Sequence, residues 1–339
     1  GVLEGLEAGS MSVGVFELGA FTLESGGVLP DAKLVYSSYG TLNAARSNVI
    51  LYPTSYGAQH TDLEWLIGPI LDPARYFIVI PNMLGNGLST SPSQLADGAP
   101  FDATHFDNVV AQDRLLREVF GVETLALAYG WSMGAQQAYH WAVLHPERVL
   151  RVAALCGTAK TRDHNIVFLR SLEAALQADP CWDGVRFQGV PTRGYRAFAR
   201  IYASWAASQA FYRERLYLTL GYLDLEDYLV RAWEASYRRR HPLDLLAMLR
   251  TWIACDVSRH HPSLAAALGT IQARTLVMPS VSDLYFTPDD CAADAALIPG
   301  ARVCAIPSIW GHRAGNPYQN PEDARFIRTA LDQLLEDVP

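Results

Sequence analysis

The stretch "LALAYGWSMGAQQAYHW" (Leu125–Trp141) decides the fold, because it joins an apolar run to a helical pattern through one sharp turn. The run Leu125–Tyr129 is continuous rather than alternating, which predicts a strand covered on both faces. The turn that follows has glycine two residues before and two residues after Ser132, at Gly130 and Gly134. A turn this tight needs glycine on both sides, and it holds the serine hydroxyl at its apex.

Composition limits the class of protein. The chain has 339 residues, half of them hydrophobic and 18% charged, which predicts one large soluble domain or a domain with a sizeable insertion. Its net charge is −8 and it has no Lys/Arg-rich run, so neither nucleic acid nor a membrane is expected as a partner. No apolar stretch approaches the ~20 residues of a membrane span.

Cysteine usage favours a cytoplasmic protein. The five cysteines are scattered and form no C-x-x-C pair, which fits reduced thiols better than a disulfide framework or a zinc site. No secretory leader is expected. Residues 1–10 precede the first methionine, Met11, and are expected to be an expression remnant outside the fold.

Short apolar runs alternate with helical patterns along most of the chain, which predicts an α/β fold with a mostly parallel central sheet flanked by helices. Strands are predicted at Asn48–Tyr52, Tyr76–Ile80, Leu125–Tyr129, Val152–Leu155, Thr275–Met278 and Arg302–Ile306. Helices are predicted at Phe106–Val119, Ala135–Leu144, Pro288–Ala296 and Pro321–Leu334. The early segment Gly14–Tyr39 is predicted to form antiparallel hairpins before the alternation begins.

An insertion interrupts this alternation. Residues 165–262 have helical periodicity without a convincing strand, and they hold 15 of the chain's 36 aromatic residues (8 Trp, 16 Tyr and 12 Phe). These aromatics either fill a core within the insertion or line an active site beneath it, and both can hold at once. We therefore predict a core formed by residues 11–164 and 263–339, with residues 165–262 as a helical cap.

The motif G-x-S-x-G is a weak signal alone and a strong one in the right context. It forms a nucleophile elbow only where it follows a strand and opens a helix, and both flanks of Ser132 are predicted to do so. The helix N-terminus behind the serine favours developing negative charge. Ser132 is therefore predicted to be the nucleophile, against the alternative of a purely structural glycine-rich turn.

A serine hydroxyl needs a base, and the base needs an orienting carboxylate. In this architecture they follow the serine in the order Asp or Glu, then His. His312 lies late in the chain, in the loop "SIWGHRAGN" after a predicted strand, and it is the predicted base. Asp283, in the loop "PSVSDLYFTPDD" after another strand, is the predicted acid, with Asp163 as the alternative.

Two backbone N–H donors are expected to stabilise an oxyanion. One belongs to Met133, the residue after the predicted nucleophile. The other is expected from the loop "PTSYGAQH" (Pro53–His60) after an early strand. Ser55 is preferred there by its position, with Thr54 or Tyr56 as alternatives.

From about Phe16 onward the chain resembles the homoserine O-acetyltransferase branch of the α/β-hydrolase superfamily. The resemblance implies an α/β-hydrolase fold with a helical cap, and a catalytic triad of Ser132, Asp283 and His312. Caps of this branch often pair subunits, so it also implies a homodimer. The similarity rests on "DPARYFIVIPNMLGNG" (Asp72–Gly87), "GWSMGAQQAYHWAVLHPERV" (Gly130–Val149), "HNIVFLRSLEAALQADPCWDG" (His164–Gly184) and "VSDLYFTPDD" with the following "IPGARV" and "GH" (Val281–His312).

The departures from that branch concern the acceptor site. The transferases generally follow the catalytic His with Asp, which helps to hold the amino-acid acceptor, whereas this chain has Arg313. Their early loop reads close to H-A-L-T-G where this chain has "PTSYG", and bulky Trp131 stands where their elbow typically has glycine. A site built for homoserine would leave polar groups unpaired without these partners.

The expected function is a serine hydrolase that cleaves an acyl ester, or a related activated acyl bond, through an acyl-enzyme with water as the acceptor. Tyr56, Trp131 and Arg313 are expected to contact the small-molecule acyl substrate. Two alternatives stay open: acyl transfer from an acyl-CoA to an alcohol, and a non-catalytic ligand binder on the same fold. No metal or nucleotide cofactor is expected, because the sequence has no H-E-x-x-H, no phosphate-binding Gly-Lys loop and no G-x-G-x-x-G after a strand.

Overall fold

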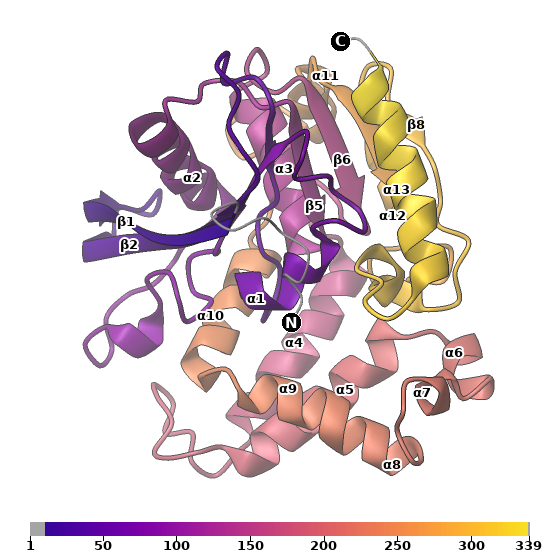
Figure 1. The fold of residues 1–339 in the computed structure, drawn as a ribbon. Coiled ribbons are helices and arrows are strands. Elements are labelled where there is room, and N and C mark those ends of the chain that lie inside the picture. Colours follow the sequence, from indigo (N-terminus) through magenta and orange to yellow (C-terminus); the bar gives the residue numbers. More distant parts are fainter. Residues whose placement is uncertain (1–10, 338–339) are drawn as a thin grey trace.

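A computed structural model describes residues 11–337 (Figure 1), so residues 1–10, the expected remnant, lie outside the described part. One sheet has the strand order β1-β2-β4-β3-β5-β6-β7-β8. β1 and β2 form an antiparallel hairpin and β2 pairs antiparallel with β4, whereas every pair from β4 to β8 is parallel, which confirms the predicted sheet. The strands are β1 (Met11–Thr22), β2 (Val28–Tyr39), β3 (Val49–Leu51), β4 (Phe77–Pro81), β5 (Leu127–Trp131), β6 (Arg151–Leu155), β7 (Arg274–Met278) and β8 (Arg302–Val303).

Alternate residues of the central strands enter two different hydrophobic clusters. In β3, Val49 and Leu51 belong to one cluster, while Ile50 belongs to the other. In β5, Ala128 belongs to the first cluster and Tyr129 to the second. Because both faces of the sheet are buried, these strands appear in the sequence as continuous apolar runs.

Helices from both ends of the chain cover these two faces. α2 (His105–Phe120) and α3 (Met133–Leu144) contribute to the first cluster, and α13 (Pro321–Glu336) and α1 (His60–Leu63) contribute to the second. α12 (Pro288–Ala295) packs against β7 and β8. Short 3-10 turns lie at Glu64–Leu66, Pro92–Gln94 and Gly311–Gly315. Among the described residues, no helix combines the length and the apolar character needed to cross a bilayer.

Between β6 and β7 the chain leaves the sheet, and most of its helices there form a layer drawn below the sheet in Figure 1. The last of them, Leu264–Gly269, is drawn at the opposite end of the sheet. The predicted insertion, residues 165–262, spans the helices of the layer, although the first of these begins two residues earlier, at Asp163. A π-helical turn, Leu229–Glu234, joins α8 to α9. The helices are α4 (Asp163–Gln177), α5 (Thr192–Ala206), α6 (Gln209–Arg213), α7 (Leu216–Thr219), α8 (Leu225–Tyr228), α9 (Ala235–Arg238), α10 (Pro242–Ile253) and α11 (Leu264–Gly269). We refer to α4–α10 as the cap.

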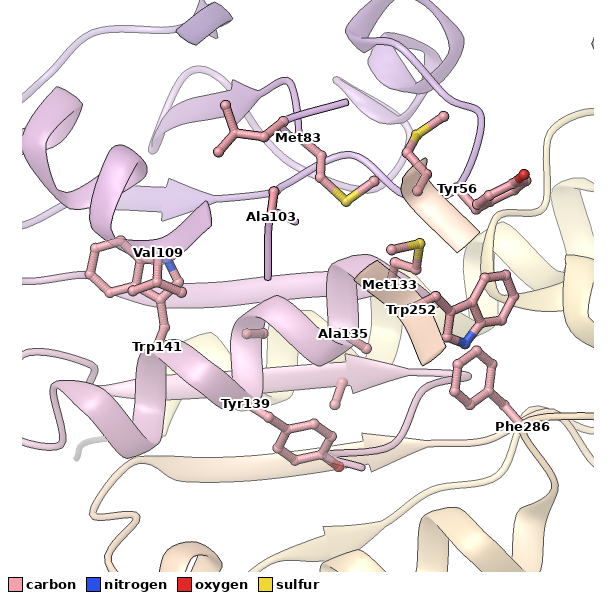
Figure 2. Close-up of a cluster of buried hydrophobic side chains, with 14 of the residues drawn as sticks. Tyr56, Met83, Ala103, Val109, Met133, Ala135, Tyr139, Trp141, Trp252 and Phe286 are labelled. Carbon is pink, nitrogen blue, oxygen red and sulfur yellow. The ribbon is translucent and has the colours of Figure 1, made fainter. Parts of the chain in front are cut away.

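Aromatic side chains join the cap to the core. The indole of Trp252, in α10, stacks on the ring of Phe286, which follows β7, with centroids 5.5 Å apart and planes 6° from parallel. Figure 2 shows this pair near Met133, the first residue of α3. Tyr56 also packs on Trp252, with centroids 5.7 Å apart. The cap therefore meets the core where β5 and β7 end.

One predicted strand is shorter than expected. Arg302–Ile306 was predicted, but β8 has only Arg302–Val303. Beyond it, the backbone N–H groups of Cys304 and Ile306 still donate to Val277 and Pro279, at 2.9 and 2.7 Å. The regular ladder stops because Pro279 has no N–H to donate in return.

Candidate active site

Ser132 lies at the turn between β5 and α3. Its backbone has φ 61° and ψ −124°, a strained conformation for a residue with a side chain. The turn is too tight for other side chains, since a Cβ at Gly130 would lie 2.0 Å from the carbonyl carbon of Gly134. A Cβ at Gly134 would lie 3.0 Å from the carbonyl oxygen of Pro53. The strand–turn–helix context expected around Ser132 is therefore present.

His312 and Asp283 form a buried hydrogen-bonded pair. His312 Nδ1–H donates to Asp283 Oδ2 at 2.7 Å, and the two side chains are only 3% and 0% exposed. The second carboxylate oxygen, Oδ1, accepts from the backbone N–H groups of Tyr285 and Phe286, at 3.1 and 3.0 Å. These bonds fix the carboxylate and leave His312 Nε2 available. Asp163, the alternative acid, is exposed at the start of α4.

The structure places Ser132 and His312 on the wall of the same cavity. Across residues 11–337, no hydrogen bond joins Ser132 Oγ to His312, although catalytic bonds of this kind are often long in an enzyme without substrate. The three residues of the predicted triad are thus brought to one site: Asp283 holds the imidazole, and the imidazole shares the cavity with the hydroxyl.

Three aromatic rings surround the imidazole of His312. Its centroid lies 5.1 Å from that of Trp131, 4.5 Å from that of Tyr285 and 5.5 Å from that of Phe286. The indole N–H of Trp131 also donates to the carbonyl oxygen of His312 at 3.0 Å. Trp131, expected to contact substrate, therefore also contacts the predicted base.

The loop Pro53–His60 carries the predicted oxyanion donor Ser55. The backbone N–H of Thr54 donates to Pro81 at 3.2 Å and is therefore occupied. Within the described residues, the backbone N–H of Ser55 has no acceptor, and its buried hydroxyl also has no partner. Met133, the other predicted donor, begins α3, and the first N–H groups of a helix have no intrahelical acceptor.

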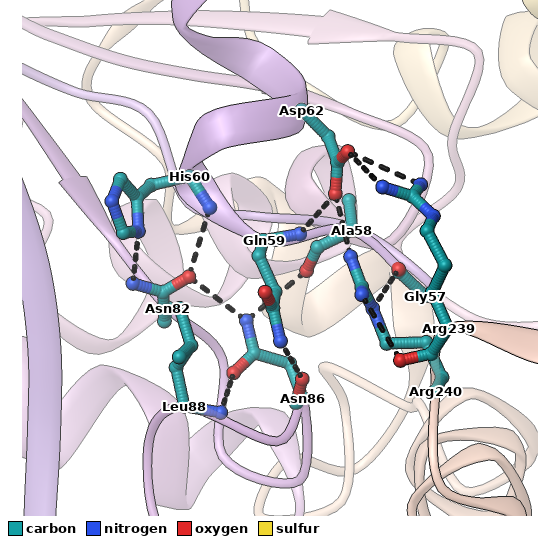
Figure 3. A network of polar contacts seen from close by, with 10 residues as sticks. All are labelled: Gly57, Ala58, Gln59, His60, Asp62, Asn82, Asn86, Leu88, Arg239 and Arg240. Carbon is teal, nitrogen blue, oxygen red and sulfur yellow. Dashed lines mark hydrogen bonds and ion pairs between the residues drawn. The ribbon is translucent and has the colours of Figure 1, made fainter. Parts of the chain in front are cut away.

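Polar side chains hold this loop on its core side (Figure 3). Asn82 Oδ1 accepts from the backbone N–H of His60 at 3.0 Å. Asn86 Nδ2 donates to the carbonyl oxygen of Ala58 at 3.1 Å and to Asn82 Oδ1 at 3.0 Å. Gln137, in α3, donates from Nε2 to Thr54 at 3.0 Å. The loop is therefore fixed relative to the helix that Ser132 opens.

The cap holds the same loop from the other side. Arg240 Nε donates to the carbonyl oxygen of Gly57 at 2.8 Å, and Arg240 Nη2 pairs with Asp62 Oδ2 at 2.7 Å (Figure 3). The hydroxyl of Tyr56 donates to the carbonyl oxygen of Leu245, in α10, at 2.8 Å. Arg240 is only 7% exposed and Asp62 is 26% exposed, so the ion pair is partly shielded from water. The loop thus lies between two sets of fixed partners.

The cavity that contains Ser132 has a volume of about 630 Å³, within the range of small-molecule sites. All three residues expected to contact the substrate, Tyr56, Trp131 and Arg313, line it. Nine aromatic residues contribute to its wall: Tyr56, Trp65, Trp131, Tyr202, Tyr222, Trp233, Tyr237, Tyr285 and Tyr318.

Comparison with known proteins agrees with this architecture. The family model described as the alpha/beta hydrolase fold matches residues 48–312. The chain belongs to the α/β-hydrolase fold family. A probable esterase of Corynebacterium glutamicum is 40% identical to this hydrolase over 307 residues, which cover 87% of this chain and 88% of the relative. An ethyl acetate hydrolase of Pseudomonas veronii is 38% identical over 312 residues, which cover 88% of this chain and 89% of the relative.

The resemblance to the transferase branch is confirmed, at lower identity. A homoserine O-acetyltransferase of Thermobifida fusca is 32% identical to this α/β-hydrolase over 326 residues, which cover 86% of each chain. Among solved structures, an acetylester hydrolase from Corynebacterium glutamicum has a TM-score of 0.91 and 37% identity, over 96% of each chain. The chain is thus more similar in sequence to the two hydrolases than to this transferase.

In this α/β-hydrolase, Arg313 brings a positive charge to the cavity without a carboxylate partner among the described residues. Its guanidinium carbon lies 5.7 Å from the ring centroid of Trp233 and 6.0 Å from that of Trp310. Arg313 Nη1 lies 3.5 Å from the hydroxyl of Tyr228. Aromatic faces therefore hold the cation through its attraction to their π electrons.

The loop that carries His312 also contacts the cap. The hydroxyl of Ser208 donates to the carbonyl oxygen of Ile309. Gly311 has φ 64°, and a Cβ there would lie 2.8 Å from the carbonyl oxygen of Ala206, the last residue of α5. The position of the imidazole thus depends on the cap as well as on the core.

Within the described part of the hydrolase, one buried group has the spacing of metal ligands: Cys156, Asp283 and His312, whose ligand atoms lie within 4.8 Å of one another. Burial, and to a lesser extent Asp283, raises the pKa of the Cys156 thiol well above its usual range. The thiol therefore stays protonated and is a poor metal ligand at neutral pH. The arrangement fits an oriented histidine better than a metal site.

Sequence reasoning missed several residues of this site. Tyr285 and Phe286 follow Asp283 at the offsets of an Asx turn, and that spacing is a signal from which their N–H bonds could have been predicted. Asn86 and Arg240 act on the loop at Pro53–His60 from distant parts of the chain. No local pattern marks them.

Proposed function

We propose that the protein is a serine esterase that hydrolyses short-chain acyl esters through Ser132, His312 and Asp283. The observation that carries this proposal is the 2.7 Å bond between buried His312 and Asp283, beside a cavity lined by Ser132 at a strained elbow. A carboxylate that orients a histidine next to a serine is the arrangement that activates a hydroxyl for attack.

In the proposed first half-reaction, Ser132 Oγ attacks the ester carbonyl carbon while His312 Nε2 accepts the hydroxyl proton. Asp283 stabilises the imidazolium through the Nδ1–H bond. The carbonyl oxygen becomes an oxyanion that accepts from the backbone N–H groups of Met133 and Ser55, and the buried hydroxyl of Ser55 is a third donor. The ester C–O bond then breaks, and His312 returns its proton to the leaving alcohol.

In the second half-reaction, water attacks the acyl carbon and His312 Nε2 accepts a proton from it. The bond between Ser132 Oγ and the acyl carbon breaks, Ser132 regains its proton, and the carboxylic acid leaves. We propose water rather than an amino-acid alcohol as the acceptor, because the Arg313 cation repels an ammonium group.

The proposed acyl group is short, with acetyl as the leading choice. One relative is named an ethyl acetate hydrolase, and one similar structure is described as an acetylester hydrolase. The cavity wall includes the large rings of Tyr202 and Tyr285, which are 6% and 2% exposed and leave little room to move aside. Longer acyl chains are therefore expected to react more slowly.

A second candidate is acyl transfer from an acyl-CoA to an alcohol. The 32% identity to a homoserine O-acetyltransferase favours it. It differs from the first candidate in the acyl donor, a thioester instead of an ester, and in the acceptor that attacks the acyl-enzyme at Ser132, so the two are separable by product analysis.

The proposal is tested with p-nitrophenyl esters of increasing acyl length, with and without acetyl-CoA and homoserine. We expect hydrolysis that is fastest for acetate and is not accelerated by homoserine. A fluorophosphonate probe should add once, at Ser132, and Ser132→Ala should abolish both labelling and turnover, while Ser204→Ala, a change at an exposed serine of α5, preserves both. Labelling at another serine, or efficient formation of acetylhomoserine, would contradict the proposal.

A further inference from the structure

The cavity has an excess of positive charge. Three arginines line it, Arg231, Arg239 and Arg313, against one carboxylate, Asp62. Arg231 forms two bonds with Asp227, at 2.5 and 2.6 Å, and Arg239 pairs with Asp62 at 3.3 Å. Arg231 is thus neutralised by Asp227, while Arg239, whose side chain is 55% exposed, shares Asp62 with Arg240. Among the described residues, Arg313 is the lining arginine that has no carboxylate partner.

Over residues 11–337, Arg313 has hydrogen-bond donors that no protein group accepts. A guanidinium has five N–H donors in a planar fork. The rings of Trp233 and Trp310 attract its charge, but they offer no oxygen to accept these donors. Within the described residues, its one hydrogen bond goes to the hydroxyl of Tyr228 at a long 3.5 Å. A planar cation held in this way is oriented to receive an anionic group of a ligand.

The described lining residues offer no counter-charge to Arg313. The one carboxylate among them is Asp62, which already pairs with Arg239 and Arg240. An anionic group of a bound substrate would supply that counter-charge.

We infer that Arg313 forms a carboxylate subsite, and that the preferred substrates are esters of a short acid whose alcohol half carries a carboxylate. The inference rests on the proposed esterase function at Ser132. The charge belongs to the alcohol half, because a group as small as acetyl cannot carry it. A guanidinium fork matches a carboxylate with two parallel hydrogen bonds.

The test compares 4-acetoxybenzoate with its neutral analogue 4-acetoxybenzamide. The measured quantity is the kcat/KM for the anion divided by that for the amide, in wild type and in variants. Arg313→Gln should lower this ratio about tenfold or more, the effect of losing a charge-assisted hydrogen bond. Arg313→Lys should lower it less, because the charge remains without the fork.

The matched control is Arg231→Gln, which removes a cation that lines the same cavity and already has a carboxylate partner. It should leave the ratio unchanged. Since intrinsic reactivities of the two esters are the same for every variant, they cancel when ratios are compared. The free product 4-hydroxybenzoate should also inhibit wild type more strongly than 4-hydroxybenzamide, and Arg313→Gln should remove that difference.

Three outcomes are distinguishable. If wild type cleaves neither ester, the proposed esterase function fails. If it cleaves both and Arg313→Gln lowers the two kcat/KM values equally, Arg313 has only a structural role and the carboxylate subsite alone is overturned. If Arg231→Gln lowers the ratio as much as Arg313→Gln does, the preference comes from the overall potential of the cavity, and the assignment to Arg313 is wrong.

Discussion

The indole N–H of Trp131 donates to the carbonyl oxygen of His312 at 3.0 Å, so the residue before the proposed nucleophile holds the residue proposed as base. The two rings also lie 30° from parallel with centroids 5.1 Å apart. This contact needs Gly315, since a Cβ there would lie 2.4 Å from Trp131 Cδ1. One side chain thus sets the spacing between two loops that are far apart in sequence.

Replacing Trp131 with Phe should therefore lower kcat threefold to tenfold, the range for losing one neutral hydrogen bond of about 1 kcal/mol. The ring face against His312 remains, so the loss reports the bond to the backbone. Steady-state kinetics with p-nitrophenyl acetate measures it. Trp182→Phe is the control, because Trp182 packs on Phe187 in the segment between α4 and α5 and does not line the cavity, so kcat should stay unchanged. A kcat for Trp131→Phe equal to wild type would show that the bond does not position the base.

Asp283→Asn should reduce kcat by about 10⁴-fold, because the amide no longer holds His312 in the tautomer that accepts a proton at Nε2. Rapid kinetics at pH 7 on the purified variant measures the loss. Asp163→Asn changes an exposed carboxylate at the start of α4 and should behave as wild type. The opposite pattern would assign the acid to Asp163.

Arg240→Gln should destabilise the protein by about 2 kcal/mol, because Asp62 and the carbonyl oxygen of Gly57 lose a buried partner. Guanidinium unfolding measures this change. It should also lower kcat, since Gly57 belongs to the loop of the proposed oxyanion donor Ser55. Arg239→Gln is the control: Arg239 pairs with the same Asp62 at 3.3 Å, but its side chain is 55% exposed, so its removal should cost less than about 0.5 kcal/mol. Equal losses in both variants would show that burial of Arg240 adds nothing.

Stability should fall with acid through two buried histidines. Burial lowers the pKa of His105 to about 3 and that of His140 to about 4, whereas both have a pKa near 6.5 in the unfolded chain. Above pH 6.5 neither the folded nor the unfolded state binds these protons, so they do not change the free energy of unfolding. Between pH 6.5 and about 4 the unfolded state binds them and the folded state does not, so the free energy of unfolding drops as pH falls.

Each of these histidines should contribute about 1 kcal/mol per pH unit across that window. Chemical unfolding between pH 4.5 and 7 measures the slope, and His105→Gln should make it shallower than in wild type. His260→Gln is the control, because His260 is exposed and pairs with Glu24. An unchanged slope in His105→Gln would show that the ring is protonated in the folded protein.

Local patterns were sufficient to predict most of the fold and the places of the proposed triad residues after the strand ends. The elbow at Ser132 was predictable because the close approach of Gly130 and Gly134 requires glycine at both positions. The loops with Asp283 and His312 follow the parallel strands β7 and β8, and parallel strands bring such loops to one edge of the sheet.

The supports of the site were not predictable in this way. Arg240 bonds to Gly57, 183 positions away, and Trp131 bonds to His312, 181 positions away. The first contact depends on how the cap packs on the core, and the second on how two distant loops of the core meet. The period of hydrophobic residues encodes neither. The end of β8 was also misplaced, because the missing N–H of Pro279 acts on a neighbouring strand rather than on its own segment.

The contacts of Ser208 and Ala206 with the loop that holds His312 have a consequence for heat inactivation. If α5 and α6 separate from the core on heating, the loop of His312 loses these contacts, and the imidazole is displaced before the sheet unfolds. Turnover should therefore stop at a lower temperature than the loss of β-sheet signal in circular dichroism. The highest temperature at which the enzyme turns over is then set by the interface between the cap and the core. Engineering for heat resistance should therefore begin at that interface rather than in the interior of the sheet.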